Sequence, residues 1–151
     1  MRHAPFLALV FAATLVTPAL HAQAPEDRER ASEPVLRQLE AFRRGDYDLA
    51  YTFASTEIQS LFDRLAFERM VRSGYPEIAD SASARVVERR IAPDGHVLLV
   101  LKIRGANGRH IEALYDMVWE AGMWKVNGVV ARPDPGETTI DRHGRSRFKD
   151  A

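Results

Sequence analysis

Few residues of this chain are spaced so that they could act together in acid–base chemistry. Asp116 directly follows Tyr115, and a carboxylate next to a phenol is a pair that acid–base enzymes can use. Neighbouring residues of a strand point to opposite faces of the sheet, so Asp116 points outward if Tyr115 points inward. The two side chains therefore form no dyad on one wall unless a bulge intervenes. Asp80 and Glu88 could reach a pocket mouth, but nothing in their spacing requires it.

Metal and nucleophilic sites find no support in the residue spacing. His96 and His110 open adjacent predicted strands at opposite ends of a hairpin, so they lie far apart, and His143 belongs to the polar C-terminal segment. The sequence contains no HExxH motif, no calcium loop and no serine within Gly-x-Ser-x-Gly. It also contains no cysteine, which excludes disulfides and thiol catalysis. We therefore expect neither a metal nor a cofactor.

The first 22 residues have the pattern of a secretory signal peptide. A basic start at Arg2 is followed by an apolar run from Phe6 to Ala19 and by a small residue at Ala22, after which we expect cleavage. Ala24 is the alternative cleavage position. The run is too short to span a bilayer comfortably, so the mature chain is expected to have no integral membrane span. We predict an exported protein, periplasmic or secreted, of a Gram-negative bacterium.

The charge balance argues against a dedicated nucleic-acid binder. Lys and Arg number 21 and Asp and Glu number 21, whereas nucleic-acid binders show a basic excess. Residues 133–151 are rich in Pro, Gly and charged residues and are predicted to form a mobile polar tail. The basic residues between Arg142 and Lys149 could meet an anionic surface, although most such runs are solvated.

Apolar residues recur at helical spacing before residue 75. Residues 23–31 are polar and predict a flexible leader, and Ser32 has the character of an N-cap for a helix over residues 33–44. Asp46 or Asp48 is expected to open a second helix, and Ser55 or Thr56 to open a third. The apolar pattern of this third helical region continues to residue 74, where Tyr75-Pro76 should end it.

Beyond residue 82 the apolar period becomes two, which predicts strands separated by glycine-containing turns. The predicted strands cover residues 84–91, 96–104, 110–120 and 123–131. In the third strand one face carries Ile111, Ala113, Tyr115, Met117 and Trp119. In the fourth strand, Trp124 and Val126 share one face, Lys125 and Asn127 share the other, and Asn127-Gly128 is either a bulge or an early turn.

Two segments resemble an uncharacterised bacterial family, domain of unknown function 4864, over roughly residues 34–131. The first segment contains Tyr47-Asp48-Leu49-Ala50-Tyr51-Thr52-Phe53-Ala54-Ser55, Ile58-Gln59-Ser60-Leu61-Phe62 and Phe67-Glu68-Arg69-Met70-Val71-Arg72-Ser73-Gly74-Tyr75-Pro76. The second contains Tyr115-Asp116-Met117-Val118-Trp119 and Trp124-Lys125-Val126-Asn127-Gly128-Val129. The resemblance implies the cone-shaped α+β fold of the nuclear transport factor 2-like (SnoaL-like, cystatin-like) superfamily, which also houses ketosteroid isomerases and cyclases. Because the family has no assigned activity, the resemblance implies no catalytic residue.

We therefore predict a single α+β domain over residues 32–132, with N-terminal helices packed on a curved four-stranded antiparallel meander. Such a cone offers a cavity between its layers. The residues expected to line this cavity and bind ligand are Tyr51, Phe62, Met70, Tyr115, Met117 and Trp119. The alternative interpretation is that these side chains simply fill the core, because an apolar stripe is first of all a core face.

Three functions remain open at this point. The leading one is a non-enzymatic exported module that holds a small apolar ligand or a partner, and we lean against an enzyme. The second is an isomerase- or cyclase-type enzyme, which requires a carboxylate or histidine in the cavity. The third is a structural or assembly protein that dimerises through its sheet. The apolar residues available for a homodimer on the outer sheet face are Leu98, Val100, Leu114, Val118 and Val129.

Overall fold

The computed structural model describes residues 25–136. The predicted signal peptide and residues 137–151 of the predicted tail lie outside this range, so export and tail binding stay predictions. Over residues 25–136, no helix is both long enough and apolar enough to cross a membrane.

The described chain contains six helices followed by four strands. The helices are α1 (Pro25–Glu29), α2 (Ser32–Arg43), α3 (Tyr47–Thr52), α4 (Thr56–Leu61), α5 (Arg64–Gly74) and α6 (Pro76–Ala79). The strands are β1 (Ser81–Ile91), β2 (Val97–Gly105), β3 (His110–Glu120) and β4 (Met123–Pro133). The predicted bounds of β3 are confirmed, whereas β1 begins three residues earlier and β4 ends two residues later than predicted.

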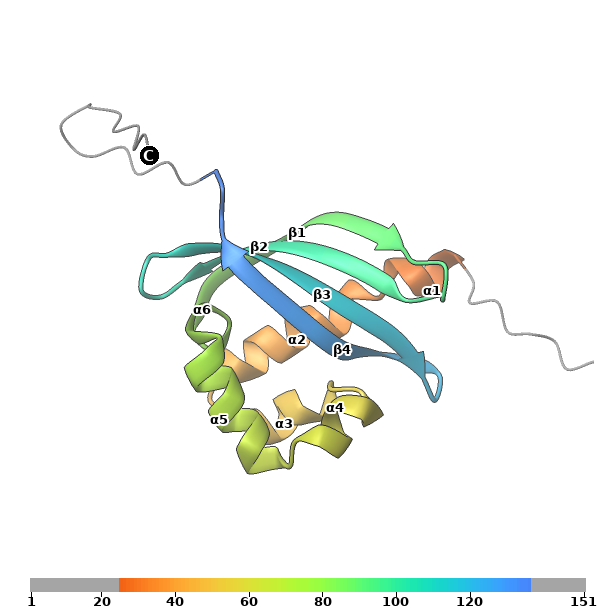
Figure 1. Cartoon of the computed structure of the whole chain (residues 1–151), viewed down its shortest axis with the longest axis horizontal. Helices are drawn as coiled ribbons and strands as arrows, with labels where there is room; N and C mark the ends of the chain where they lie inside the picture. Colours follow the sequence, from red (N-terminus) through yellow and green to blue (C-terminus); the bar gives the residue numbers. More distant parts are fainter. Residues whose placement is uncertain (1–24, 137–151) are drawn as a thin grey trace, which may run out of the picture.

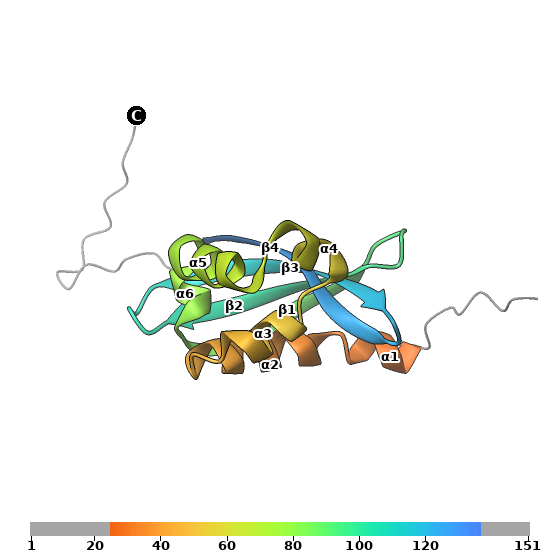
Figure 2. The same cartoon turned by 90° about the horizontal axis from the view of Figure 1, so that it is seen from below.

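The strands form one antiparallel sheet in the order β1-β2-β3-β4, in which each strand pairs with the next along the chain. Figure 1 shows the helices beneath one face of the bent sheet, and the view from below in Figure 2 shows them lying across that face. The core lies between these two layers. The predicted α+β fold, helices packed on a curved four-stranded meander, is thereby confirmed.

Side-chain caps divide the helical half of the chain. Asp46 accepts from the backbone N–H of Leu49 at 3.0 Å, and Ser55 Oγ accepts from that of Ile58 at 3.2 Å. Asp63 accepts from the N–H of Ala66 at 2.7 Å and starts α5. Each cap satisfies a donor that the first helical turn leaves unpaired. The helical region predicted to run unbroken to residue 74 is therefore interrupted at Phe62, whose backbone is extended, before the Asp63 cap.

The N-terminal part of the chain differs from the prediction. The segment predicted as a flexible leader contains helix α1, and the carbonyl of Asp27 accepts a hydrogen bond from Trp124 Nε1 on β4 at 2.5 Å. This bond ties the leader to the sheet. Ser32 lies inside α2 rather than capping it, because the helical backbone already begins at Ala31, where no side-chain cap forms. The predicted helix end at residue 74 is confirmed, because α5 ends at Gly74. Pro76 then opens a further short helix, α6, since proline is tolerated at a first helical position.

Strand β4 contains a bulge at Asn127. Asp116 pairs with Gly128 and Met117 pairs with Val126, so Asn127 has no partner of its own on β3. An extra residue shifts the alternation of the strand by one position. Val126 therefore faces the helices before the bulge, and Val129 faces them after it. The prediction that Val129 belongs to the outer face is wrong for this reason, and Val130 takes the exposed position at 69 % exposure.

The loop between α3 and α4 is bound to the edge of β4 beside this bulge. The N–H of Ser55 donates to the carbonyl of Val126 at 2.9 Å, and the N–H of Val126 donates to that of Phe53 at 2.8 Å. Ser55 Oγ also donates to Asn127 Oδ1 at 2.8 Å, and Asn127 Nδ2 donates to Asp116 Oδ2 at 3.0 Å. Both ends of the Asn127 amide are thus used to hold the bulge against the helical layer.

Beyond β4 the chain stays on the sheet for at least one residue of the predicted tail. Lys102 Nζ donates to both carboxylate oxygens of Asp134 at 2.9 Å. The hydrogen bond from Lys102 holds the pKa of Asp134 below its usual value. Asp134 is therefore anchored, in contrast to the mobile tail predicted from residue 133.

The Ser55 hydroxyl both caps α4 and bonds to Asn127. Its removal therefore tests how much the contact between the helical layer and β4 stabilises the fold. We expect Ser55→Ala to lower the free energy of unfolding by about 2 kcal/mol, because it removes a helix cap and a buried hydrogen bond to Asn127. The matched control is Ser60→Ala, whose exposed hydroxyl bonds only within its own helix, and which should stay within about 0.5 kcal/mol of wild type. Urea unfolding measures both. Equal effects of the two substitutions would contradict the assignment.

Candidate functional site

A cavity of about 270 Å³ lies between the helical layer and the sheet. Its lining is apolar except for three side chains that carry a polar group, Gln38, Tyr75 and Tyr115. The apolar lining consists of Phe42, Ala54, Ile58, Phe62, Phe67, Met70, Val71, Ile78, Val126, Gly128 and Val129. This volume is just below the range of about 300–1,000 Å³ that is usual for small-molecule sites.

The cavity is deep on one side and open on the other. Its sheet wall comes from Tyr115 on β3 and from the two valines that flank the bulge of β4. Tyr115, Phe42 and Ile78 are fully buried, whereas Ile58, Phe62, Met70 and Val129 are half-buried. The open side therefore lies between helices α4 and α5 and the edge strand β4.

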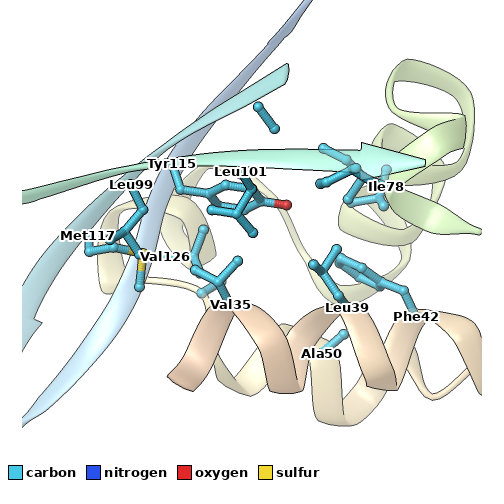
Figure 3. Packing of buried hydrophobic residues seen from close by; sticks show 14 of the residues in the cluster. Val35, Leu39, Phe42, Ala50, Ile78, Leu99, Leu101, Tyr115, Met117 and Val126 are labelled. Carbon is cyan, nitrogen blue, oxygen red and sulfur yellow. The ribbon is translucent and has the colours of Figure 1, made fainter. Parts of the chain in front are cut away.

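Tyr115 brings an unpaired hydroxyl to this cavity. The residue is 1 % exposed, and its hydroxyl has no hydrogen-bond partner in the described part of the chain. Figure 3 shows the hydroxyl pointing from β3 into the space beside Leu39, Phe42 and Ile78. Burial raises the pKa of Tyr115 far above its ordinary value, and nearby Tyr75 raises it further. The hydroxyl therefore keeps its proton and can act as a hydrogen-bond donor.

The other two polar side chains of the lining hold the walls of the cavity. Gln38 Nε2 donates to the carbonyl of Ala50 at 3.1 Å and thereby joins α2 to α3. The Tyr75 hydroxyl donates to the carbonyl of Val129 at 3.2 Å and joins the end of α5 to β4. Both donors are occupied by backbone carbonyls. This leaves Tyr115 as the lining residue, among those described, with a buried donor that has no partner.

Three of the six predicted lining residues do line the cavity, namely Phe62, Met70 and Tyr115. The structure brings them together from the residue that follows α4, from α5 and from β3. That they bind a ligand stays a prediction. The inward face predicted for β3 is confirmed, since Ile111, Ala113 and Tyr115 are buried beneath the sheet.

The other three predicted lining residues lie outside the cavity. Met117 is completely buried and packs into the core nearer the β3–β4 turn. Trp119 packs edge-on against Trp124 with ring centroids 5.3 Å apart and borders a separate cleft at that turn. Tyr51 points its hydroxyl at the carbonyl of Phe62, 2.6 Å away, so it fastens α3 to α4. Strand alternation gives the correct face for Met117 and Trp119 but not the position along the strand.

The lining also contains residues that were not predicted to line it, Gln38 and Val129 among them. A signal for Gln38 exists, because it lies three residues after Val35 and four before Phe42, on the buried face of α2. A polar residue on such a face indicates either a hydrogen bond to the interior or a cavity. For Val129 no such signal exists without knowledge of the bulge.

The carboxylates and histidines lie away from the cavity. Asp116 points to the opposite face of the sheet from Tyr115, as strand alternation predicted, and its Oδ1 lies 2.8 Å from Nδ1 of His96. Glu88 forms an ion pair with Arg90, and Asp80 is exposed. No Asp, Glu or His is part of the lining within residues 25–136. In the same range no three such side chains are grouped in a way that could hold a metal ion.

Comparisons with known proteins cover the whole described domain. The sequence model of the family described as "Domain of unknown function (DUF4864)" matches residues 25–139. Among solved structures, the chain is similar to that of Aln2 from a Streptomyces species, with 16% sequence identity and a TM-score of 0.48. This match covers 74% of the present chain and 93% of the other. A search of curated proteins found no match.

The free energy of unfolding should show that the Tyr115 hydroxyl has no hydrogen-bond partner. We expect Tyr115→Phe to leave the free energy of unfolding unchanged or to raise it by up to about 1 kcal/mol, because it removes a buried donor without breaking a hydrogen bond. Tyr51→Phe is the matched control and should cost about 1 kcal/mol, since it breaks the bond to Phe62. Urea unfolding compares the two. A loss in Tyr115→Phe as large as that in Tyr51→Phe would show that the hydroxyl has a partner.

Proposed function

Because this chain belongs to the family Domain of unknown function (DUF4864), whose description gives no activity, we propose a function from the cavity itself: it binds a small, mostly apolar ligand. The observation that carries the proposal is a space of about 270 Å³ lined mainly by apolar side chains. Protein interiors are otherwise packed to the density of organic crystals, so a space of this size is a specific feature of the fold.

The apolar lining of the cavity and its open side both support ligand binding there. Phe42, Phe67 and the valines of β4 offer apolar contact, and burial of apolar surface stabilises a complex by about 25 cal/mol for each Å². The half-buried side chains of Ile58, Phe62 and Met70 form the open side. A volume just below the usual range of small-molecule sites suits a small ligand with about two fused rings.

A non-enzymatic role is better supported than an isomerase- or cyclase-type activity. General acid–base catalysis needs a titratable group within reach of the substrate, with a pKa near the working pH. The described lining contains no carboxylate and no imidazole, and burial raises the pKa of Tyr115 away from neutrality. The cavity therefore offers a hydrogen bond and apolar contact but no base.

In the alternative function, an assembly protein, the chain would dimerise through the face of the sheet opposite the helices. Leu114 and Val130 lie side by side there, with 38 % and 69 % of their surfaces exposed. The ion pair between Glu112 and Arg132 adjoins them. A homodimer through this face is compatible with a ligand in the cavity, which lies on the other side of the sheet. The signal-like residues 1–22 support placing either function outside the cytoplasm.

Filling the cavity should abolish binding of an apolar probe. We expect Met70→Trp to block the saturable binding of tetralin, because the half-buried Met70 side chain lies at the open side and a larger ring would occupy the space. Methyl NMR of Val129 and Ile58 during a tetralin titration measures this directly.

The matched control is Leu61→Trp, on the neighbouring helix, where the side chain is 66 % exposed and lies outside the lining. This variant should bind tetralin as wild type does. The proposal fails if wild type shows no saturable shift of the Val129 and Ile58 methyls, or if folded Met70→Trp binds tetralin as tightly as Leu61→Trp.

A further inference from the structure

The unpaired hydroxyl of Tyr115 identifies the class of ligand more closely. Buried polar groups in folded proteins almost always have a hydrogen-bond partner, and one without a partner requires an explanation. Tyr115 is 1 % exposed, lines the cavity and finds no acceptor within residues 25–136. A group that enters the cavity would meet this donor at its deep end.

The two neighbouring polar side chains of the lining do not accept a hydrogen bond from the Tyr115 hydroxyl. The amide of Gln38 donates to Ala50, and the hydroxyl of Tyr75 donates to Val129. Both bonds join wall elements and hold these side chains in place, so turning either side chain toward Tyr115 would loosen the cavity. The acceptor for Tyr115 is therefore best supplied by the ligand.

The lining also restricts the charge of that acceptor. It contains no Lys, Arg or His in the described part of the chain, so a carboxylate at the deep end would be buried without a cation. Burying an uncompensated charge is far more costly than burying a neutral dipole. A neutral oxygen acceptor meets both conditions, because it accepts one hydrogen bond and needs no counter-charge.

We propose that the ligand carries a neutral carbonyl-type oxygen, which accepts a hydrogen bond from the Tyr115 hydroxyl, on a compact apolar body. The inference rests on the proposed binding function. The carbonyl end enters first and lies beneath β3, and the apolar body lies between the valines of β4 and helices α4 and α5. Tyr115 is thus a specificity-determining residue of the cavity.

A pair of probes of nearly equal shape tests this proposal. 1-Tetralone carries a ketone, and tetralin is the corresponding hydrocarbon. The dissociation constants of both probes are measured for wild type and for Tyr115→Phe by methyl NMR. We expect the ratio of ketone to hydrocarbon affinity to fall about tenfold in Tyr115→Phe, the effect of one neutral hydrogen bond. Because each variant is compared with itself, general changes of the cavity cancel.

Two further measurements keep the proposal testable if Tyr115→Phe folds poorly. The infrared carbonyl band of 1-tetralone labelled with carbon-13 at the ketone should lie at lower frequency when bound to wild type than in a hydrocarbon solvent, as hydrogen bonding weakens the C=O bond. Tyr51→Phe serves as the control variant and should keep the wild-type affinity ratio, since Tyr51 lies outside the lining and its hydroxyl bonds the carbonyl of Phe62. The anionic probe 1,2,3,4-tetrahydro-1-naphthoate should bind at least tenfold more weakly than the ketone.

The outcomes separate this inference from the proposed function. If both neutral probes bind but the affinity ratio is the same in Tyr115→Phe, or the carbonyl band keeps the position it has in a hydrocarbon solvent, the carbonyl assignment is wrong and the binding function stands. If the naphthoate binds as tightly as the ketone, the restriction to neutral ligands is wrong. If neither neutral probe binds wild type, the binding function and the inference fall together.

Discussion

The bulge at Asn127 is the constraint on which the inner surface of this protein depends. The extra residue in β4 has no partner on β3, and both ends of its amide are held, one by Ser55 from the helical layer and one by Asp116 from the sheet. Without it, strict alternation would turn Val129 toward the outer face. With it, Val126 and Val129 both lie beneath the sheet and build the wall opposite α4 and α5. The bulge thus connects the register of one edge strand to the shape of the cavity.

The same contacts explain why the space remains open. The loop before α4 is hydrogen-bonded to the edge of β4, and the Asp63 cap starts α5 in a new direction after an extended Phe62. Tyr51 fastens α3 to Phe62, and Tyr75 fastens the end of α5 to β4. The hydrogen bonds of Tyr51 and Tyr75 hold these two large side chains in the surrounding structure, so they do not fill the space. Tyr115 alone, among the lining residues described, brings a buried polar group without a partner, which is why its hydroxyl dominates the chemistry we infer.

Much of the fold could be predicted from residue patterns, because local rules decide it. The alternation along β3 places Tyr115 inside and Asp116 outside, and the capping roles expected of Asp46 and Ser55 are those observed. The cavity could be predicted only in part. Whether Met117 and Trp119 line the cavity depends on their position along β3 relative to the helices, which local patterns do not give. The inward turn of Val129 depends on a bulge, and Asn127-Gly128 is equally compatible with an early turn. Helix α1 depends on a tertiary contact with Trp124 that no local pattern contains.

The most direct test of this account is a nuclear Overhauser measurement between valine methyls and the ring protons of Tyr115 in protein labelled at these side chains. Tyr115 and Val129 are paired across β3 and β4, whereas Val130 pairs with Leu114 on the exposed face. We predict strong cross-peaks from the Tyr115 ring to the methyls of Val129 and none to those of Val130. Cross-peaks to Val130 in place of Val129 would show that β4 runs through Asn127 without a bulge, and the wall of the cavity described above would not exist.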